Sequence, residues 1–406
     1  MDNRTTQPVS IPPMGLKRYY PVGFIINLMI ILIFGLLMLF SASYTTGYLR
    51  FDDSYHFIRS QVIFAVFGIF VMLVAAQFNY HNYKKFAIPG YILSLILLMV
   101  VLTCEPINGC RRWLHWPNTP LDFIPSIQVS EIVKFVIILC TAQTMLRVRR
   151  HRNHLWYGLC LPALWLIPVL ILLFLEPHLS GMVLMIMIVG SMLLLGGNGF
   201  VWIMGVAGAC VGVFTMFPQF FHELTSYAGD RLEGWTSEFD NMLWQTQQSL
   251  LAIGSGGITG LGIGNSMEKQ LWLPECTNDF IFSILCEELG FLGAAVVILL
   301  FLGLIFQSLY IAYNASDLYG TLIALGITAQ ITWQVFFNIA VVTNTVPNTG
   351  ISLPFFSSGG TSLVLLMGEM GVMLNIARQG TRAQLQRKAK KEAAQQAAQT
   401  SDTKEN

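Results

Sequence analysis

Charged side chains are scarce in this sequence. Only 11% of its 406 residues are charged, whereas 54% are hydrophobic, and the mean hydropathy is +0.60. No soluble domain needs so much apolar surface, so the composition excludes an ordinary water-soluble protein. Because charged side chains are few, those that lie in or near apolar segments become the first candidates for chemistry.

Several familiar site patterns are also missing. The seven cysteines are scattered at spacings that do not suit zinc. No basic stripe of the kind found on nucleic-acid-binding domains is present. The glycine-rich run 254–264 lacks the Gly-Lys-Ser/Thr ending of a phosphate-binding P-loop. These absences argue against a zinc protein, a nucleic-acid-binding protein and a P-loop nucleotide-binding protein.

The dominant feature of the sequence is a series of long hydrophobic segments. About ten segments read as membrane spans, and they cover residues 22–41, 60–78, 86–102, 129–146, 156–174, 182–195, 201–217, 280–312, 322–342 and 362–376. The sixth segment is short and flanked by glycine, whereas the eighth is long enough to be tilted or to extend beyond the membrane. We therefore predict an all-α polytopic membrane protein with about ten transmembrane helices.

Basic residues are distributed unevenly between the two sides of the predicted bundle. Most of the 23 Lys and Arg residues fall on the side of the termini, namely Arg4, Lys17, Arg18, Lys84, Lys85, Arg147, Arg149, Arg150, Arg152, Arg378, Arg382, Arg387, Lys388, Lys390, Lys391 and Lys404. The positive-inside rule then predicts that both termini are cytoplasmic. We expect a cytoplasmic segment 1–20, a membrane domain 21–378 and a disordered basic tail 379–406.

Two outer connections are long, about 103–128 and 218–278. The second is long enough to be functional in its own right, and it lies between the seventh and eighth predicted helices. It contains the stretch 244–253, which could form an interfacial helix, and the glycine run, which permits tight turns. It ends at Asp279, directly before an apolar run. An Asp in that position is either a helix N-cap or a carboxylate available for chemistry at the membrane boundary.

Other charged residues lie in or near the spans, and they are Glu131, Lys134, Glu176, Glu287, Glu288 and Glu369. Glu131 and Lys134 are three residues apart, so they share one helix face and can pair. The pair is either a neutralised anchor of its helix or part of a charged wall in a polar cavity. Arg111 and Arg112 either reach the membrane interface beside Trp113 or serve a polar site.

Several motifs together resemble the SEDS family (shape, elongation, division and sporulation), which includes FtsW, RodA and SpoVE. In chain order they are Gly109-Cys110-Arg111-Arg112-Trp113-Leu114, Gln128-Val129-Ser130-Glu131 with Lys134, Glu176-Pro177-His178, the glycine-rich stretch 249–266, Leu273-Pro274-Glu275 through Asp279-Phe280 with Glu287-Glu288-Leu289-Gly290, and the final loop 347–362. Each motif alone is a weak signal. Their order, spacing and coincidence with the predicted spans are specific.

The sequence departs from the family pattern at four places. Val129 stands where the family has Pro, and His178 stands where it has Asp. Thr277-Asn278 replaces a usual His-Thr, and Ser358 replaces Tyr. Asp279 and the Glu131–Lys134 pair are retained.

The resemblance implies a peptidoglycan glycosyltransferase that polymerises lipid II, an undecaprenyl-pyrophosphate-linked disaccharide peptide, on the outer face of a bacterial cytoplasmic membrane. The reaction would be an inverting displacement with Asp279 as general base. The expected substrate-binding residues are Arg111, Arg112, Glu131, Lys134, Arg231, Gln248, Ser249, Lys269, Glu275, Ser357, Gly359 and Gly360. No metal ligand cluster is evident, although a divalent cation (Mg or Mn) could bridge the pyrophosphate and a carboxylate.

The resemblance also implies partners and a cellular role. A class B penicillin-binding protein would cross-link the new strands, and other membrane proteins of the divisome or elongasome would assemble with the pair. Ser41-Ala42-Ser43 favours the FtsW and SpoVE side, whereas the loop 347–355 is closer to RodA or SpoVE. We favour an FtsW-like role in division. A lipid II flippase and a non-catalytic scaffold are the alternatives, although no repeat relates the two halves of the chain as in many transporters.

Overall fold

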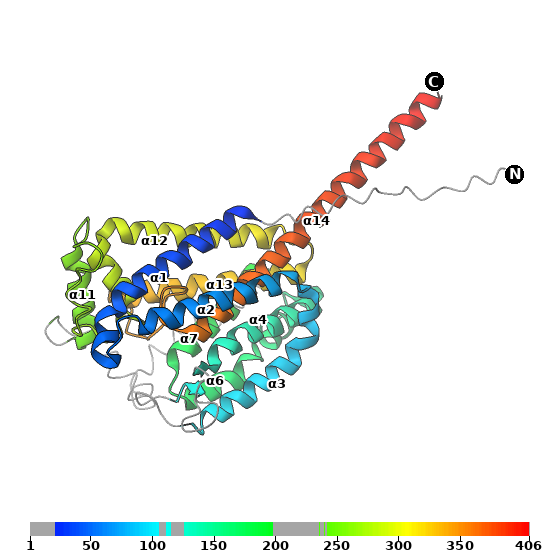
Figure 1. Cartoon of the computed structure of the whole chain (residues 1–406). Helices are drawn as coiled ribbons and strands as arrows, with labels where there is room; N and C mark the ends of the chain where they lie inside the picture. The colour runs from blue at the N-terminus through cyan, green and yellow to red at the C-terminus, as the bar shows by residue number, and fades with distance from the viewer. Residues whose placement is uncertain are drawn as a thin grey trace.

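The structure, a computed structural model, describes residues 21–104, 111–114, 126–197, 235, 239 and 242–405. These residues are mostly helical, and the long helices lie side by side in one bundle (Figure 1). Within the described ranges, eight helices are long and apolar enough to cross a membrane, and a ninth, α7 (Leu179–Leu195), is a shorter apolar helix. Helices suit this setting because each one satisfies its backbone hydrogen bonds internally. The prediction of an all-α polytopic membrane protein is confirmed.

The observed elements follow the predicted segments closely. In chain order they are α1 (Val22–Phe51), α2 (His56–Gln77), η1 (Tyr80–Asn82), α3 (Tyr83–Val101), β1 (Trp113–Leu114), β2 (Ile127–Gln128), α4 (Val129–Arg147), η2 (Arg149–His151), η3 (Leu155–Cys160), α5 (Leu161–Ala163), α6 (Leu166–Leu175), α7, α11 (Trp244–Gly256), α12 (Ile281–Tyr313), α13 (Leu318–Val342) and α14 (Gly360–Glu405). The two short strands pair antiparallel. The expected segment 1–20, the expected span 201–217 and most of the loop 218–241 lie outside the described residues.

The helices α4 and α13 form the centre of the bundle. About three quarters of their apolar windows are buried, 78% for α4 and 72% for α13, against 22% for the peripheral α2. A central helix meets protein on most sides, so it can carry polar side chains that lipid would reject. Glu131 and Lys134 of α4 are buried, as are Gln330, Gln334 and Asn338 of α13. Much of the polar interior of the molecule therefore comes from these two helices.

The helix α2 contacts the rest of the bundle through a single narrow stripe. Its buried residues recur at helical spacing and are mostly small, and they are Gln61, Ala65, Gly68, Met72 and Ala76. The stripe faces α14, where a Cβ added to Gly371 would lie 2.3 Å from the carbonyl oxygen of Met72. Small residues let two membrane helices approach this closely.

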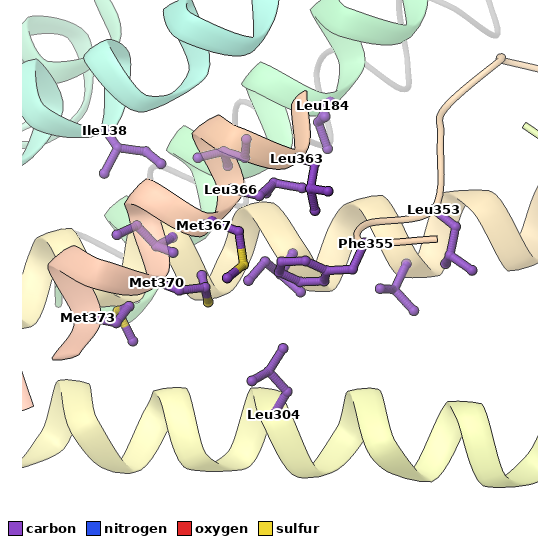
Figure 2. Packing of buried hydrophobic residues seen from close by; sticks show 14 of the residues in the cluster. Ile138, Leu184, Leu304, Leu353, Phe355, Leu363, Leu366, Met367, Met370 and Met373 are labelled. Carbon is purple, nitrogen blue, oxygen red and sulfur yellow. The ribbon is translucent and has the colours of Figure 1, made fainter. Parts of the chain in front are cut away.

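The buried side of α14 is an apolar layer. Figure 2 shows its members alongside Leu304 of α12 and Phe355 of the preceding loop, and they are Leu363, Leu366, Met367, Met370 and Met373. Flexible methionine side chains fill irregular gaps between helices. This layer holds the start of α14 firmly in the bundle.

Beyond the bundle, α14 continues as a helix as far as Glu405 and projects away from the other helices (Figure 1). The sequence led us to expect a disordered tail over 379–406, whereas the structure describes a continuous helix as far as Glu405. The tail is rich in Ala, Gln and Lys, which have high helix propensity and extend a helix that tertiary packing has already nucleated.

The long helix α12 is interrupted at Gly290, where φ is 64° and ψ is −167°. The glycine-rich run lies against this interruption. The Gly262 N–H donates to the carbonyl of Glu288 at 2.9 Å, and the Phe291 N–H donates to the carbonyl of Gly257 at 2.9 Å. The glycines thus make tight turns, as expected, and they supply backbone partners that a broken helix would otherwise lack.

Candidate active site

A cavity of about 820 Å³ opens at one end of the bundle. The chain reaches this end where α1 finishes and where α4, α7, α12 and α14 begin. It is the end opposite to the one from which α14 projects (Figure 1). Because helix starts expose N–H groups and loops carry polar residues, this end gathers polar chemistry that the apolar spans lack.

Asp279 lies on the wall of this cavity. It precedes α12, but the N-cap of that helix is Phe280, which makes no side-chain cap hydrogen bond. The structure thus places the N-cap one residue beyond Asp279. Its carboxylate lies beside Gly350, where an added Cβ would be 3.1 Å from Oδ2. The absence of a side chain at position 350 leaves room for this carboxylate.

The backbone of Asp279 is held by Asn338 of α13. The Asn338 Nδ2 donates to the carbonyl of Asp279 at 2.7 Å and to the carbonyl of Ile351 at 2.8 Å. Asn338 is fully buried, so water does not compete for these bonds. One amide group thus joins the loop before α12 to the loop before α14.

The loop before α14 also fixes the residues that precede Asp279. The Ser357 hydroxyl donates to the carbonyl of Asn278 at 2.7 Å, and the Ser358 N–H donates to the carbonyl of Thr277 at 2.8 Å. Gln61 of α2 braces the same loop, because its side chain donates to the Ser357 carbonyl at 3.4 Å. Ser357, expected to bind substrate, lies behind the cavity wall and positions it.

The Glu131–Lys134 pair is formed, and both residues line the cavity. The Lys134 Nζ lies 2.7 Å from Glu131 Oε1, and both side chains are buried. The Ser362 hydroxyl donates to the other carboxylate oxygen at 3.2 Å. The sequence offered two interpretations, a neutralised pair and a charged cavity wall. The structure combines them, because Glu131 and Lys134 neutralise each other and both line the cavity. Its Nζ has donors left for another partner.

Arg112 lies beside the turn between α6 and α7. Its Nη2 donates to the Pro177 carbonyl at 2.7 Å, and it lines the cavity together with His178. Burial, and then the charges of Arg112 and Lys134, lower the pKa of His178 to about 3, so the imidazole is uncharged at neutral pH. Burial raises the pKa of Glu176 to about 8, although Arg112 opposes the shift.

Some expected substrate-binding residues have structural contacts instead. Arg111 donates to the carbonyl of Leu102 at 2.8 Å, away from the cavity lining. Ser249 is fully buried on α11 and its hydroxyl lies 2.7 Å from that of Ser283. Gln248, on the same helix, is also buried and does not line the cavity. These are corrections to the predicted site.

Lys269 is a further correction. Its Nζ lies 2.6 Å from Glu288 Oε1, and both side chains are buried outside the cavity lining. The Ser41 hydroxyl donates to the same carboxylate at 2.7 Å. Lys269 therefore ties the loop before α12 to α1 and α12 and is not available to an anionic ligand. Sequence spacing gave no indication of a partner 19 residues away.

The remaining expected residues divide in a simple way. Glu275 and Gly359 line the cavity, whereas Gly360 starts α14 behind it. Arg231 lies outside the described residues. The structure adds cavity residues that no motif indicated, namely Arg50, Gln245 and Gln334, and it also places Asn348 and Ser352 of the final-loop motif on the cavity lining. Arg50 could have been suspected, because it is a basic residue on the side opposite to the basic tail.

The residues do not fit a divalent cation well. Over the described ranges, no three His, Cys, Asp or Glu side chains gather as a metal site would require. Glu131 is already paired with Lys134. Chemistry at this cavity is therefore assigned to the side chains of the protein itself.

Proteins of known family have sequences similar to that of this chain. Residues 22–382 match the family model for FtsW, RodA and SpoVE, described as cell cycle protein. The chain is 34% identical to stage V sporulation protein E of Bacillus subtilis over 363 residues, which cover 87% of this chain and 96% of that protein. It is 34% identical over 370 residues to a probable peptidoglycan glycosyltransferase FtsW of Coxiella burnetii, covering 88% and 96% of the two chains.

Solved structures share the fold. A chain from a peptidoglycan synthase complex superposes with a TM-score of 0.71 at 23% identity, covering 89% of this chain and 98% of that one. The rod shape determining protein RodA of Thermus thermophilus superposes with a TM-score of 0.63 at 24% identity, covering 90% and 98%. Since the sequence match spans most of the chain, this integral membrane protein belongs to the family of FtsW, RodA and SpoVE.

Proposed function

We propose that this protein is a peptidoglycan glycosyltransferase that polymerises lipid II into glycan strands. Relatives named as probable peptidoglycan glycosyltransferases support this activity, since they align with most of the chain. The observation that carries the proposal is the position of Asp279. A carboxylate that lines the same polar cavity as Arg112 and the buried Lys134 suits the transfer of a sugar from a diphosphate leaving group.

Asp279 serves as the general base. Its carboxylate takes the proton from the acceptor hydroxyl as that oxygen forms a bond to the anomeric carbon of the donor. The bond between the anomeric carbon and the phosphate oxygen breaks at the same time, and the diphosphate leaves with the electron pair. One displacement of this kind inverts the anomeric configuration. The fixed backbone of Asp279 holds the base in place, because Asn338 and the loop at Ser357 anchor it on two sides.

Arg112 and Lys134 stabilise the charge that develops on the leaving diphosphate. Both line the same cavity as Asp279, and Lys134 is buried, so its charge acts in a medium of low dielectric constant. Glu131 neutralises Lys134 before the substrate arrives and keeps its ammonium in place.

We further propose that the cavity faces outward from the cytoplasmic membrane of a bacterium. The basic tail and most Lys and Arg residues lie toward the opposite end, which favours a cytoplasmic location for that end. We also propose a class B penicillin-binding protein as partner, with other divisome or elongasome membrane proteins. The superposed chain belongs to a peptidoglycan synthase complex that coordinates polymerisation and crosslinking, which is in keeping with a crosslinking partner. An FtsW-like role in division remains our preferred assignment.

The test is polymerisation of lipid II by the purified full chain, with a candidate transpeptidase partner supplied. D279A and D279N should each lose activity by about 10²–10⁴-fold. The matched control is D53N, which removes a carboxylate at the same end of the bundle that is ion-paired to Arg59 at 3.5 Å and does not line the cavity. It should keep near-native activity.

Two results would reject the enzyme. Transbilayer movement of lipid II without any polymer, unchanged in D279A, would indicate a flippase. Full growth of a depleted strain on D279N would indicate a scaffold. Unfolding temperatures of all variants must match the native chain, so that loss of activity is not loss of folding.

A further inference from the structure

The first turn of α7 lies on the cavity wall, and the proposed reaction assigns no role to it. His178 is the N-cap of this 17-residue helix. It lines the cavity, and so do Ser180 and Gly181 of the first turn. The first turn of a helix has N–H groups without intrahelical acceptors and carries a partial positive charge, which favours an anion.

His178 itself provides the second observation. Only 6% of the residue is exposed, and its Nδ1 is a buried atom without a hydrogen-bond partner among the described residues. The opposite edge of the ring lies over Gly181, where an added Cβ would be 2.1 Å from Cδ2. A buried polar atom without a partner is costly. The unpaired Nδ1 of His178 therefore indicates that a ligand or a water molecule forms a hydrogen bond with this atom.

Neighbouring atoms on the same wall share this property. Arg112 Nε and Ser130 Oγ are also buried and have no partner within the described ranges, and both residues line the cavity. Lys134 adds a buried ammonium nearby. Two cations, a hydroxyl, a helix N-terminus and one imidazole thus surround the same space. Such a set fits a compact, highly charged anion with several acceptor oxygens.

We propose that these groups form one subsite for the diphosphate of the lipid-linked donor, in which His178 is the specificity-determining hydrogen-bond partner. This inference rests on the proposed function. The subsite holds the diphosphate through the protein's own cations and does not need a divalent ion as bridge. A carboxylate at position 178 would instead repel the diphosphate, unless a divalent cation joined the two.

The uncharged state of the imidazole is consistent with this role. Its lowered pKa leaves it neutral at neutral pH, so it adds hydrogen bonding without competing with Arg112 or Lys134 for charge. An Asp in place of His178 would change the charge of the subsite by one unit, which is large beside the few charges on the cavity wall.

The experiment measures binding, independently of turnover. The full chain in detergent is titrated with undecaprenyl diphosphate and, separately, with inorganic pyrophosphate, in EDTA and in Mg²⁺. The native chain should bind the lipid form with affinities that differ less than about twofold between the two buffers. H178D should bind at least about tenfold more weakly in EDTA, equivalent to about 1.4 kcal/mol, and should recover in Mg²⁺. H178N keeps a neutral hydrogen-bonding group and should lose less than H178D.

The control is H151D, which makes the same exchange at an exposed residue of η2 on the other end of the bundle. Its affinity should match the native chain. If H178D fails to fold, G181A displaces the imidazole without changing charge and should also weaken binding.

Three results would overturn the proposal: equal affinities for H178D and the native chain in EDTA, loss of native binding in EDTA, or binding of free pyrophosphate that the lipid form does not displace. The proposed function fails separately, through absence of polymer from the native chain. A chain that binds the diphosphate as described but makes no polymer would leave the subsite standing.

Discussion

Asn338 gives the sharpest test of how the structure positions its base. The substitution N338L keeps the size of the side chain and removes the amide that donates to Asp279 at 2.7 Å and to Ile351 at 2.8 Å. Both carbonyls then lose a buried donor. An unsatisfied buried group costs about 1–3 kcal/mol, so the two together should destabilise this end by about 2–6 kcal/mol. A displacement of Asp279 by about 1 Å would lower the polymerisation rate by roughly 100-fold.

The matched control is N375L at the opposite end of the bundle. Asn375 is also buried, and its amide donates to the carbonyl of Ala76 at 2.8 Å and accepts from the Tyr80 N–H at 3.1 Å. It should therefore cost a similar free energy of unfolding. It should leave the rate per folded molecule near native, because it lies far from the cavity lining.

The assay combines thermal unfolding in detergent with polymerisation of lipid II, normalised to folded protein. N338L should lose both stability and rate per folded molecule, whereas N375L should lose only stability. Equal rates for the two variants would refute the idea that Asn338 positions the base. So would a native rate for N338L.

Three further predictions concern the buried charges and the glycine run. K134M should destabilise the protein by about 3–5 kcal/mol, because it leaves Glu131 buried without its partner; the double variant with E131Q should recover stability in thermal unfolding but remain inactive on lipid II. The pKa of Glu176 is raised from 4.5 to about 8 in the folded state, so between these two pH values the folded chain keeps a proton that the unfolded chain loses. The free energy of unfolding of the native chain should therefore fall as the pH rises from 4.5 to about 8 and level off above it. In E176Q this pH dependence should be flatter, as thermal unfolding measured across the pH range would show. G260A should destabilise strongly, since its Cβ would lie 2.2 Å from a backbone carbonyl at a φ of +78°, whereas G254A, with nothing within 4 Å, should not; equal unfolding temperatures for the two would contradict the packing described.

The spans could be predicted because hydropathy reports directly on the lipid environment. The predicted segment 129–146 and the observed α4 (Val129–Arg147) start at the same residue. The break in α12 could not be predicted in the same way. Gly290 resembles any other glycine in an apolar run, and only the approach of the glycine-rich loop shows why the helix must open there.

The candidate site was predictable where motifs and local spacing agree. Glu131 and Lys134 are three residues apart, which brings them to one face of the helix, so their ion pair could be predicted from the sequence spacing. The role of Lys269 was wrongly predicted because its partner Glu288 lies 19 residues away on another element, beyond the reach of helical spacing. Arg50 was missed because a single basic residue at the end of a span carries no local pattern. Long-range pairing decides which charges remain available to a substrate.

The composition of the cavity wall has a consequence for biosynthesis. Its residues come from the end of α1 through to Ser362 on α14, the last helix, so the wall is assembled from nearly the whole length of the chain. A nascent chain halted at the end of α13 already contains Asp279 but lacks the loop at Ser357 that anchors it. The site therefore stays incomplete until residues 357–362 have been translated. Half-made copies held in the translocon would be unable to process substrate, and co-expressed fragments should regain activity only when the piece that carries α14 joins the rest.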